Sequence, residues 1–589
     1  MITITDILKS REFRFPIVLA VMLAVALVMD SSIVYGAMIA AGLVSLAWES
    51  WERLRKKKWN LDYLAFIALV LSLTLGEMLP GAVVALMVAV SAALEKYGTT
   101  RAEKTLRGLF ENIPKTVMRK VGQGTESVAL QDVRPGDVII VKRSEMIAID
   151  GILVSEKGLF NEANLTGEME PVVYEHGTLL KGGIINVGET AELRVKGDFE
   201  HSSYRRILGL VEEGKTHPSP LGRLAERYNG YFTVFSLAVA FAAYAFSGDW
   251  TRFLAVLVIA TPCPLLIAAP LSFIGGLNKA ARKNIIIKGP YALELLARTK
   301  RFFFDKTGTL TLGVPHLKRI ELFDKHIDKD GALALSAALE WHSFHPLAKA
   351  FIEAHAVHGE ERFFAEDVEE VIGKGIFGTI AGQRYGIVKA EDAKDNGIVV
   401  DLLLGEHKIA RFYFDDELKA GSAKVFDYLR ERGYSLGILT GDRKVNAERI
   451  FGHFQIPIYA DCSPEKKTIL VKRYQKEGEL VGMIGDGMND APALALADIG
   501  IVFSGTENSA SIEAADVAIL GRDAWLIRDA VHIGRRSYHV AFQSIMLGIG
   551  LSSAGMLLAA AGYIPPLQGA ILQEVIDVIV IVNALRSTY

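Results

Sequence analysis

Long apolar runs alternate with polar segments along this chain of 589 residues. Eight of these runs approach the roughly 17–25 residues with which a helix crosses a bilayer. The runs occur in closely spaced pairs, which predicts helical hairpins through a membrane. They lie near residues 15–30, 33–49, 61–77, 79–96, 229–247, 252–274, 540–561 and 565–585.

The polar segments between the runs predict the orientation of the chain. The first apolar run follows Arg11 and Arg14 and leads directly into a second run without a small-residue cleavage site, so it reads as a span and not as a cleaved signal. The basic stretch 53–58 separates the second and third runs and is expected to stay in the cytosol. With paired spans, both termini and the two polar inserts, 97–228 and 275–538, are then cytosolic as well.

The two inserts differ in their periodicity. The first contains short alternating apolar runs separated by turn residues, such as 138–141 and 151–154, which predict a small β-rich domain. The second alternates apolar strand-like runs at 302–304, 436–439 and 481–484 with helical patterns. This alternation predicts a parallel, doubly wound α/β sheet with its chemistry at the carboxyl ends of the strands.

The composition fits a membrane protein that also has large soluble parts. Half of the residues are hydrophobic and the mean hydropathy is +0.27, yet 23% of the residues are charged. The net charge of −3 gives no support for a nucleic-acid partner. The two cysteines, Cys263 and Cys462, do not form the pattern of a disulfide framework or a zinc knuckle, which fits soluble parts in a reducing cytosol.

The strand-like run at 302–304 leads into the first chemical signature. It ends in the carboxylate of Asp305, and the turn that follows reads Lys-Thr-Gly-Thr. Such a carboxylate can attack the γ-phosphate of ATP and form an acyl phosphate, while hydroxyls and backbone N–H groups of the turn bind phosphoryl oxygens. An ordinary aspartate at the start of a tight turn is the plainer alternative. Residues 305–309 resemble the Asp-Lys-Thr-Gly-Thr signature of the P-type ATPase family, which implies an ATP-hydrolysing ion pump.

Further segments extend this resemblance to a whole phosphorylation site. Thr440 and Asp442 follow a predicted strand, as in the family and in haloacid dehalogenase-like phosphotransferases. Lys467 matches the family lysine that offsets phosphate charge, although alone it reads equally well as a surface lysine. The resemblance also implies Mg²⁺, which prefers oxygen-rich, partly hydrated coordination. The residues that the resemblance assigns to Mg²⁺ are Asp305, Thr307, Asp486 and Asp490.

The first insert carries a second catalytic signature. Its Thr166-Gly167-Glu168 segment resembles the dephosphorylation loop of the family. By this resemblance, Glu168 orients or deprotonates the water that hydrolyses the aspartyl phosphate.

A nucleotide site is implied within the second insert. His345 and Pro346 resemble the His-Pro signature of the heavy-metal branch, whose histidine lies near adenine, although Phe344 replaces the usual glutamate. Gly373 and Gly375 match the glycines that let the backbone approach the nucleotide. The implied cosubstrate is ATP, and a structural turn is the alternative explanation of the His-Pro pair.

The sixth apolar run contains Thr-Pro-Cys-Pro at 261–264. Proline removes N–H donors and frees carbonyls, so the helix is expected to unwind at the thiol of Cys263. The segment resembles the Cys-Pro element of heavy-metal-transporting P-type ATPases; a kinked helix with an inert cysteine is the alternative. In the last run, two acids three residues apart share a helix face, and acids at membrane depth usually mark an ion path. The expected cation ligands are Thr261, Cys263, Gln573, Glu574 and Asp577.

These ligand types limit the transported ion. One thiolate among oxygen ligands is too hard a site for Cu⁺, while alkali ions would not need the thiol. The donor set predicts export of a borderline divalent ion: iron, cobalt, nickel, zinc or cadmium. The combination of Thr-Pro-Cys-Pro with Gln-Glu-x-x-Asp resembles a subgroup of the family associated with nickel and iron, and this resemblance places nickel, iron or cobalt ahead of the alternative, zinc or cadmium. A potassium-, calcium- or magnesium-type pump and a membrane-anchored phosphatase that moves no ion are the remaining alternatives.

The expected fold is a polytopic helical membrane domain with a β-rich actuator domain and a haloacid dehalogenase-like α/β phosphorylation domain, which carries an α+β nucleotide-binding insert. The expected partners are the lipid bilayer and the metal ion, in a monomer or weak dimer in the plasma membrane of a prokaryote. The expected boundaries are 1–96 for spans one to four, 97–228 for the actuator, 229–276 for spans five and six, 277–315 and 416–538 for the phosphorylation domain, 316–415 for the nucleotide-binding domain and 539–589 for the last two spans.

Overall fold

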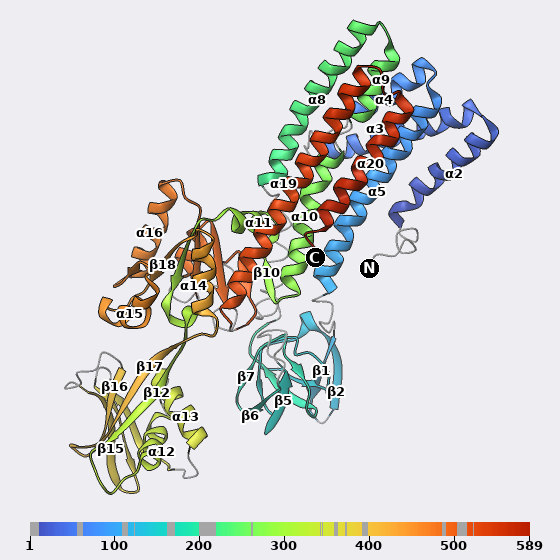
Figure 1. Cartoon of the computed structure of the whole chain (residues 1–589). Coiled ribbons are helices and arrows are strands. Elements are labelled where there is room, and N and C mark those ends of the chain that lie inside the picture. The colour runs from blue at the N-terminus through green and yellow to red at the C-terminus, as the bar shows by residue number, and fades with distance from the viewer. Residues whose placement is uncertain are drawn as a thin grey trace. The chain divides into compact units, whose positions relative to one another are not determined.

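A computed structural model gives the architecture of the chain (Figure 1). The chain divides into two compact units. The first unit comprises Met1–Leu159, Val173–Arg298 and Asp529–Tyr589, and the second comprises Phe160–Val172 and Thr299–Arg528. The residues that the structure describes are 11–55, 63–108, 116–122, 124–161, 171–198, 220–260, 263–341, 343, 346–358, 363–371, 374–390, 398–485, 490–503, 515–521 and 523–588.

Long apolar helices dominate the first unit, and every apolar run that the sequence marks as a span coincides with one or two of them. By length and composition, Gly230–Ser247, Trp525–Ala560 and Pro566–Leu585 are suited to cross a membrane, and five shorter apolar helices accompany them in the described part of the chain. The number of spans therefore stays a prediction. The helices are α2 (Arg14–Met29), α3 (Ser32–Arg55), α4 (Tyr63–Leu75), α5 (Met78–Gly108), α8 (Pro220–Ser247), α9 (Trp250–Ile259), α10 (Cys263–Ala281), α11 (Gly289–Arg298), α19 (Trp525–Ala560) and α20 (Pro566–Leu585).

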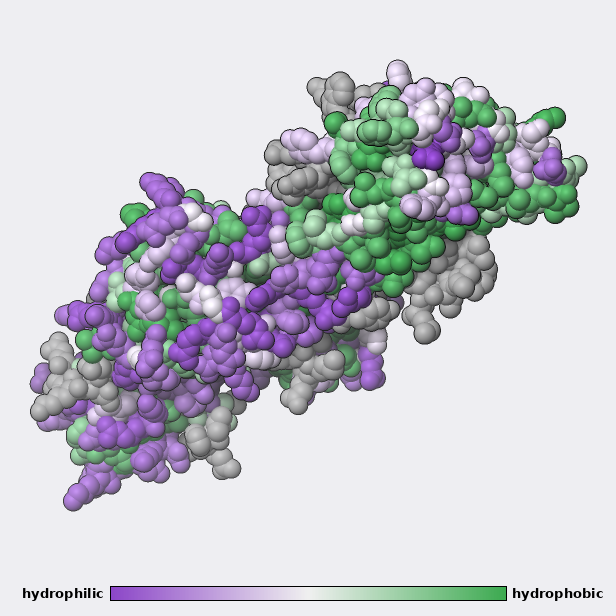
Figure 2. Space-filling view, turned by 45° about the horizontal axis from the view of Figure 1, so that its top comes forward, coloured by the Kyte–Doolittle hydropathy of each residue, from purple (hydrophilic) through white to green (hydrophobic). Residues whose placement is uncertain are grey.

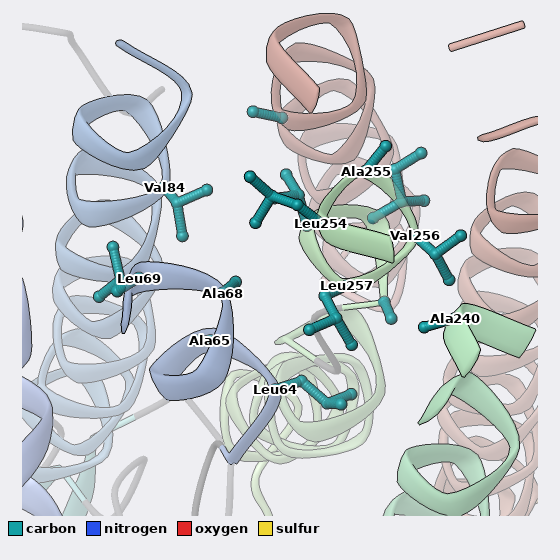
Figure 3. Packing of buried hydrophobic residues seen from close by; sticks show 14 of the residues in the cluster. Leu64, Ala65, Ala68, Leu69, Val84, Ala240, Leu254, Ala255, Val256 and Leu257 are labelled. Carbon is teal, nitrogen blue, oxygen red and sulfur yellow. The ribbon is translucent and has the colours of Figure 1, made fainter. Parts of the chain in front are cut away.

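Helix α9 lies at the centre of the helical bundle. All its residues from Phe253 to Ile259 are buried, as expected for a helix that is apolar on every side. Its residues 254–257 pack among side chains of α4, α5 and α8 (Figure 3). At the outer surface the apolar side chains are exposed, such as Phe246 with 94% of its area accessible. Figure 2 shows hydrophobic residues gathered over these helices, which is the surface that lipid contact requires.

The sixth expected span is interrupted where the sequence predicts it. Helix α9 ends at Ile259, Ala260 follows in a turn, and α10 begins at Cys263. Pro270, in contrast, lies inside α10 without ending it. Among the described residues, the end of α9 at Ile259 and the start of α10 at Cys263 thus bound the interruption.

A β-rich domain follows α5, as predicted. Its main sheet has the strand order β2-β1-β3-β9-β4-β7, and a small sheet has the order β6-β5-β8. Alternate residues of β3 and β9 are buried, which is the pattern of a sheet with one face against a core. The strands are β1 (Thr116–Val121), β2 (Gly124–Ala129), β3 (Val138–Val141), β4 (Gly151–Leu153), β5 (Lys157–Asn161), β6 (Val172–Glu175), β7 (Leu179–Leu180), β8 (Ile185–Asn186) and β9 (Ala191–Val195).

The second unit contains the predicted parallel sheet, with the order β22-β21-β20-β11-β18-β19. Its central strands are fully buried apolar runs, as in sheets covered by helices on both faces. The strands are β11 (Arg301–Asp305), β18 (Ser435–Leu439), β19 (Ile458–Tyr459), β20 (Val481–Gly485), β21 (Ile499–Phe503) and β22 (Val517–Ile519). The helices are α14 (Ser422–Glu431), α15 (Lys444–Phe451), α16 (Pro464–Lys476) and α17 (Ala491–Leu496).

An antiparallel sheet of order β12-β17-β16-β15-β14-β13 forms the insert of the second unit. Two helices, α12 (Lys329–Glu340) and α13 (Pro346–His358), contribute to its core, where Phe351 packs edge-on against Phe412 and Phe414. The strands are β12 (Thr311–Leu322), β13 (Glu366–Val371), β14 (Gly375–Ile380), β15 (Gln383–Lys389), β16 (Ile398–Leu404) and β17 (His407–Leu418).

All six of the expected domain boundaries fall inside continuous elements. Positions 96, 228, 276 and 538 lie within α5, α8, α10 and α19, and positions 315 and 415 lie within the paired strands β12 and β17. The insert is thus connected to the parallel sheet by two long strands and not by flexible linkers.

Candidate functional site

Asp305 lies at the carboxyl end of the central strand of the parallel sheet. Phe302, Phe303 and Phe304 before it are completely buried, which fixes the strand between its two neighbours. Asp305 is in register with Leu439 of β18, so Thr440 follows at the same edge. On the other side Phe304 is in register with Ile484 of β20, so β20, which ends at Gly485, ends at this edge as well.

Lys467 joins two carboxylates at this edge. Its Nζ donates to Asp305 Oδ1 at 2.5 Å and to Asp490 Oδ1 at 2.6 Å. Ser463 caps α16 by accepting a hydrogen bond from the Lys466 backbone N–H, which places Lys467 in the first turn of the helix. Burial disfavours the charged form of Lys467, but Asp305 and Asp490 outweigh burial and raise its pKa. The predicted group of these three residues therefore comes together.

A second lysine, Lys306, follows Asp305 directly and has ion pairs of its own, and sequence reasoning missed this lysine. Lys306 is paired with Asp416 of β17 and, at 2.8 Å, with Asp442 Oδ2. Burial opposes its charge, but these two carboxylates raise the pKa of Lys306. The predicted residue Asp442 thus binds the lysine of the signature turn. Lys306 is part of the signature turn, and nothing in that turn marks it as a separate site residue. Its partner Asp416 lies 110 residues further along the chain, so no local pattern reveals the pairing.

The turn Lys306–Leu310 has two hydroxyls with different environments. Thr307, a predicted site residue, is exposed, whereas Thr309 is completely buried and its Oγ1 has no hydrogen-bond partner among the described residues. Gly308 has a φ of 70°, which favours glycine. Its carbonyl accepts a hydrogen bond from Lys419. Thr440 is buried and its Oγ1 accepts a hydrogen bond from the Asp442 N–H at 3.1 Å.

Carboxylate oxygens of Asp305 and Asp490 converge on a single ammonium group at this edge. Mg²⁺ prefers such hard oxygen ligands, so the residues present fit this ion. Asp486, the further predicted ligand, lies outside the described residues.

Several other predicted site residues also lie outside the part of the chain that the structure describes. They are Glu168, Thr261, His345 and Gly373, together with the side chains of Cys263 and Pro346. Cys263 is the first residue of α10 and Pro346 the first of α13.

Two described residues of the insert, which is the predicted nucleotide-binding domain, bear on this site: the predicted Gly375 and a buried acid, Glu340. Gly375 has a φ of 149°, and a Cβ there would lie 2.0 Å from the Ile387 carbonyl oxygen, so sheet packing alone requires glycine. Glu340, which sequence reasoning missed, ends α12 and is 4% exposed. Burial and the nearby Glu370 raise the pKa of Glu340 to about 7. Its Oε2 has no hydrogen-bond partner among the residues with described positions.

The predicted cation ligands of α20 are polar groups inside the helical bundle. Gln573 is completely buried and donates to Asp577 at 2.7 Å, while Glu574 has a buried oxygen, Oε1, without a partner in the described chain. Two serines that sequence reasoning did not assign, Ser91 of α5 and Ser552 of α19, bond to this group. Within the residues described, no set of three or more His, Cys, Asp or Glu side chains is arranged to hold a metal ion.

Comparisons with known proteins agree with this architecture. Residues 299–498 match the haloacid dehalogenase-like hydrolase family, and residues 111–212 match the P-type ATPase actuator domain. The chain is 30% identical over 592 residues to the probable cadmium-transporting ATPase of Staphylococcus aureus (strain MRSA252), which covers 94% of this chain and 81% of that protein.

Two further similarities concern other metals. The chain is 31% identical over 543 residues to the copper-exporting P-type ATPase of Legionella pneumophila subsp. pneumophila (strain Philadelphia 1), with 86% of this chain and 73% of that protein covered. The crystal structure of a zinc-transporting PIB-type ATPase in its E2.Pi state matches with a TM-score of 0.66 and 28% identity, and covers 99% of this chain and 100% of that one.

Proposed function

Because the chain belongs to the metal-transporting branch of the P-type ATPase family, we propose that it exports a divalent transition metal from the cytosol through an aspartyl phosphate on Asp305. The single observation that carries this proposal is the group formed by Asp305, Lys467 and Asp490 at the carboxyl end of the parallel sheet. A nucleophilic carboxylate beside a buried ammonium can accept a phosphoryl group whose charge the ammonium offsets.

The first half-reaction uses residues of the parallel sheet. A carboxylate oxygen of Asp305 attacks the γ-phosphorus of ATP, the bond to the β,γ-bridging oxygen breaks, and ADP leaves. Lys467 and the turn around Thr307 and Thr309 offset or bind charge on the phosphoryl oxygens. When bound to Asp305, Asp486, Asp490 and Thr307, Mg²⁺ supplies further neutralisation of that charge. Thr440 and Asp442 hold the signature turn, Asp442 through Lys306.

The residues of the second half-reaction and of nucleotide binding are assigned from sequence motifs. Glu168 accepts a proton from the water that attacks the phosphorus of the aspartyl phosphate. His345, Pro346, Gly373 and Gly375 hold the adenine nucleotide. The match of residues 111–212 to the actuator domain supports the role of Glu168. The His-Pro pair and the two glycines of the insert support the nucleotide site.

Zinc or cadmium is the cargo that the comparisons favour. The similar proteins bear the names of cadmium, zinc and copper transporters, and a relative from Bacillus subtilis is named for cobalt together with cadmium and zinc. The order expected from the sequence, with nickel, iron or cobalt ahead of zinc and cadmium, therefore receives no support from them. Nickel, iron and cobalt stay a second candidate because the acids and amide of α20 supply oxygen donors, which suit ions that take five or six ligands. Cys263 and Thr261 of the interrupted helix complete the proposed site.

The remaining parts of the proposal concern location and assembly. We propose a multi-pass protein of a prokaryotic plasma membrane with both termini and both inserts in the cytosol, supported by the bacterial relatives and the basic segment 53–58. A monomer or weak dimer and the division into spans, actuator, phosphorylation and nucleotide-binding domains complete it.

The test is metal-dependent ATP hydrolysis by the purified protein in lipid vesicles. Zn²⁺, Cd²⁺, Ni²⁺, Fe²⁺, Co²⁺ and Cu⁺ are compared in turn, with Cys263→Ser as the control. Stimulation by one or more divalent ions in the wild type and its loss in Cys263→Ser support the proposal. Hydrolysis that no metal stimulates would indicate a phosphatase, and stimulation by Cu⁺ alone would contradict the divalent assignment.

A further inference from the structure

Four polar side chains from three helices form a hydrogen-bonded chain inside the helical bundle. The amide nitrogen of Gln573 donates to Asp577 Oδ1 at 2.7 Å, one turn along α20. From α5, Ser91 Oγ donates to Asp577 Oδ2 at 3.4 Å. From α19, Ser552 Oγ donates to Gln573 Oε1 at 3.2 Å. All four side chains are buried, and the most accessible of them, Ser91, is 7% exposed.

The direction of these hydrogen bonds determines what the two serines do. Each serine acts as a donor, so the chain runs from Ser552 through Gln573 to Asp577 and from Ser91 to the same carboxylate. The two oxygens of Asp577 therefore accept hydrogen bonds from different helices, and the orientation of the carboxylate is tied to α5 as well as to α20. Glu574, next to Gln573, has a buried Oε1 that finds no partner in the described chain. The face of α20 thus presents one carboxylate that is held in place and one oxygen that is available to a cation.

We propose that Ser91 is a positioning residue for the transported cation, and that Ser552 has the same role one step further away, through Gln573. This inference rests on the proposed function, because it assumes that Gln573, Glu574 and Asp577 face the ion. The serines fix the spacing between donors that project from a single helix. Donors held at fixed spacing discriminate between cations by size and coordination number, whereas loose donors adapt to each ion.

Replacement of Ser91 by alanine should therefore change apparent affinity and selectivity more than maximal rate. A hydrogen bond to a buried charged group contributes enough that its loss should raise the metal concentration for half-maximal ATPase stimulation roughly fivefold or more. The ratio of the half-maximal concentrations for Zn²⁺ and Cd²⁺ should move toward one, since a looser site distinguishes the two ions less. The rate at saturating metal should stay within about twofold.

The matched control is Ser544→Ala. Ser544 is a buried serine of α19 that also bonds across to α20, because the amide of Asn583 donates to its Oγ at 2.8 Å, but it does not contact the carboxylate. This variant also loses an interhelical hydrogen bond of a buried serine, here one that the serine accepts, and it should keep both half-maximal concentrations within about twofold of wild type. If Ser544→Ala and Ser91→Ala change the half-maximal concentrations equally, Ser91 acts only in helix packing and the inference is overturned.

The experiment measures ATPase stimulation by Zn²⁺ and Cd²⁺ in vesicles for both serine variants, for Asp577→Asn and for the double variant Ser91→Ala/Asp577→Asn. If Ser91 acts through Asp577, Ser91→Ala should change the half-maximal metal concentration by less than about twofold when Asp577→Asn is already present. If the double variant instead shows the product of the two single-variant effects on the half-maximal concentration, the inference is overturned. Phosphorylation by inorganic phosphate reports folding of each variant. If Ser91→Ala fails that check, Ser91→Thr and Ser91→Val are compared instead, because the two side chains have similar volumes and only threonine keeps the hydroxyl. Equal half-maximal concentrations in these two variants would overturn the inference. A wild type that no metal stimulates would contradict the proposed function itself.

Discussion

Two buried lysines, Lys467 and Lys306, connect the acids of the phosphorylation site. Lys467 contacts the proposed nucleophile directly, whereas Lys306 lies between Asp416 and Asp442. Removing the charge of a buried lysine leaves its carboxylate partners close together without compensation, which is costly. The two lysines are therefore expected to affect phosphorylation and not only stability.

Lys467→Met should lower the rate of phosphoenzyme formation from ATP by roughly 100-fold, because the variant lacks the charge that offsets the incoming phosphoryl group. Rapid-quench measurement of the phosphoenzyme checks this. The control is Lys466→Met, which removes an exposed neighbour whose Nζ binds only the Asp461 carbonyl among the described contacts. Equal rates in the two variants would separate Lys467 from the chemistry.

Glu340 gives a prediction about pH. Its pKa in the folded protein, about 7, lies above the ordinary value of 4.5, so the folded state holds a proton there that the unfolded chain releases. The contribution of this group to stability is fully present below about pH 4.5 and is lost as the pH rises through 7. Glu340→Gln should lack this loss and be more stable than wild type at pH 8, by about 3 kcal/mol at most.

Calorimetric unfolding of the two proteins at pH 5 and pH 8 checks the prediction. The stability difference should be small at pH 5 and larger at pH 8. An equal difference at both pH values would show that Glu340 does not titrate between them.

At the scale of elements, strand β14, which pairs with the edge strand β13 on one side and with β15 on the other, depends on a glycine. Gly375→Ala places a Cβ against the Ile387 carbonyl at a backbone angle that side chains rarely adopt. This substitution should destabilise the insert by about 3 kcal/mol and weaken ATP binding as a consequence. The control is Gly382→Ala in the turn between β14 and β15, where φ is 77° and the space is open, so only about 1 kcal/mol of backbone strain is expected. Similar losses in both variants, measured by thermal unfolding and nucleotide titration, would contradict this account.

The sequence predicts those elements whose cause is local. The buried strand before Asp305 and the helix break before Cys263 follow from runs of phenylalanine and from prolines, and the structure confirms both. The continuity of α19 across position 538 was not predicted, because a charged helical segment and an apolar span share the same period and no residue marks a break between them.

Long-range contacts could not be predicted in the same way. The pairing of Ser91 with Asp577 joins residues 486 positions apart, and it depends on how α5 packs against α20. Side chains of this kind read as simple packing in the sequence, since nothing near Ser91 signals a partner. Glu340 was missed for a related reason: its burial is produced by the fold of the insert and not by its neighbours in the chain.

At the scale of the whole molecule, the proposed pump couples a phosphorylation site in one unit to a cation site in the other. Ligands that favour different states of a protein shift its conformational equilibrium, so occupancy of the cation site should control phosphorylation. Glu574→Ala should therefore lose metal-stimulated phosphorylation by ATP while keeping phosphorylation by inorganic phosphate, which requires an empty site. Loss of both reactions, measured with radiolabelled ATP and phosphate, would indicate misfolding.

The central claim is that metal-dependent ATP hydrolysis passes through a phosphate bound to Asp305. The most direct measurement is transfer of the radiolabelled γ-phosphate of ATP to the protein, quenched in acid, with Zn²⁺ or Cd²⁺ present or removed by a chelator. The account predicts an acid-stable, hydroxylamine-sensitive phosphoprotein that appears only with metal in the wild type and never in Asp305→Asn, whose amide is not a nucleophile. A phosphoprotein of the same stability in Asp305→Asn would contradict it.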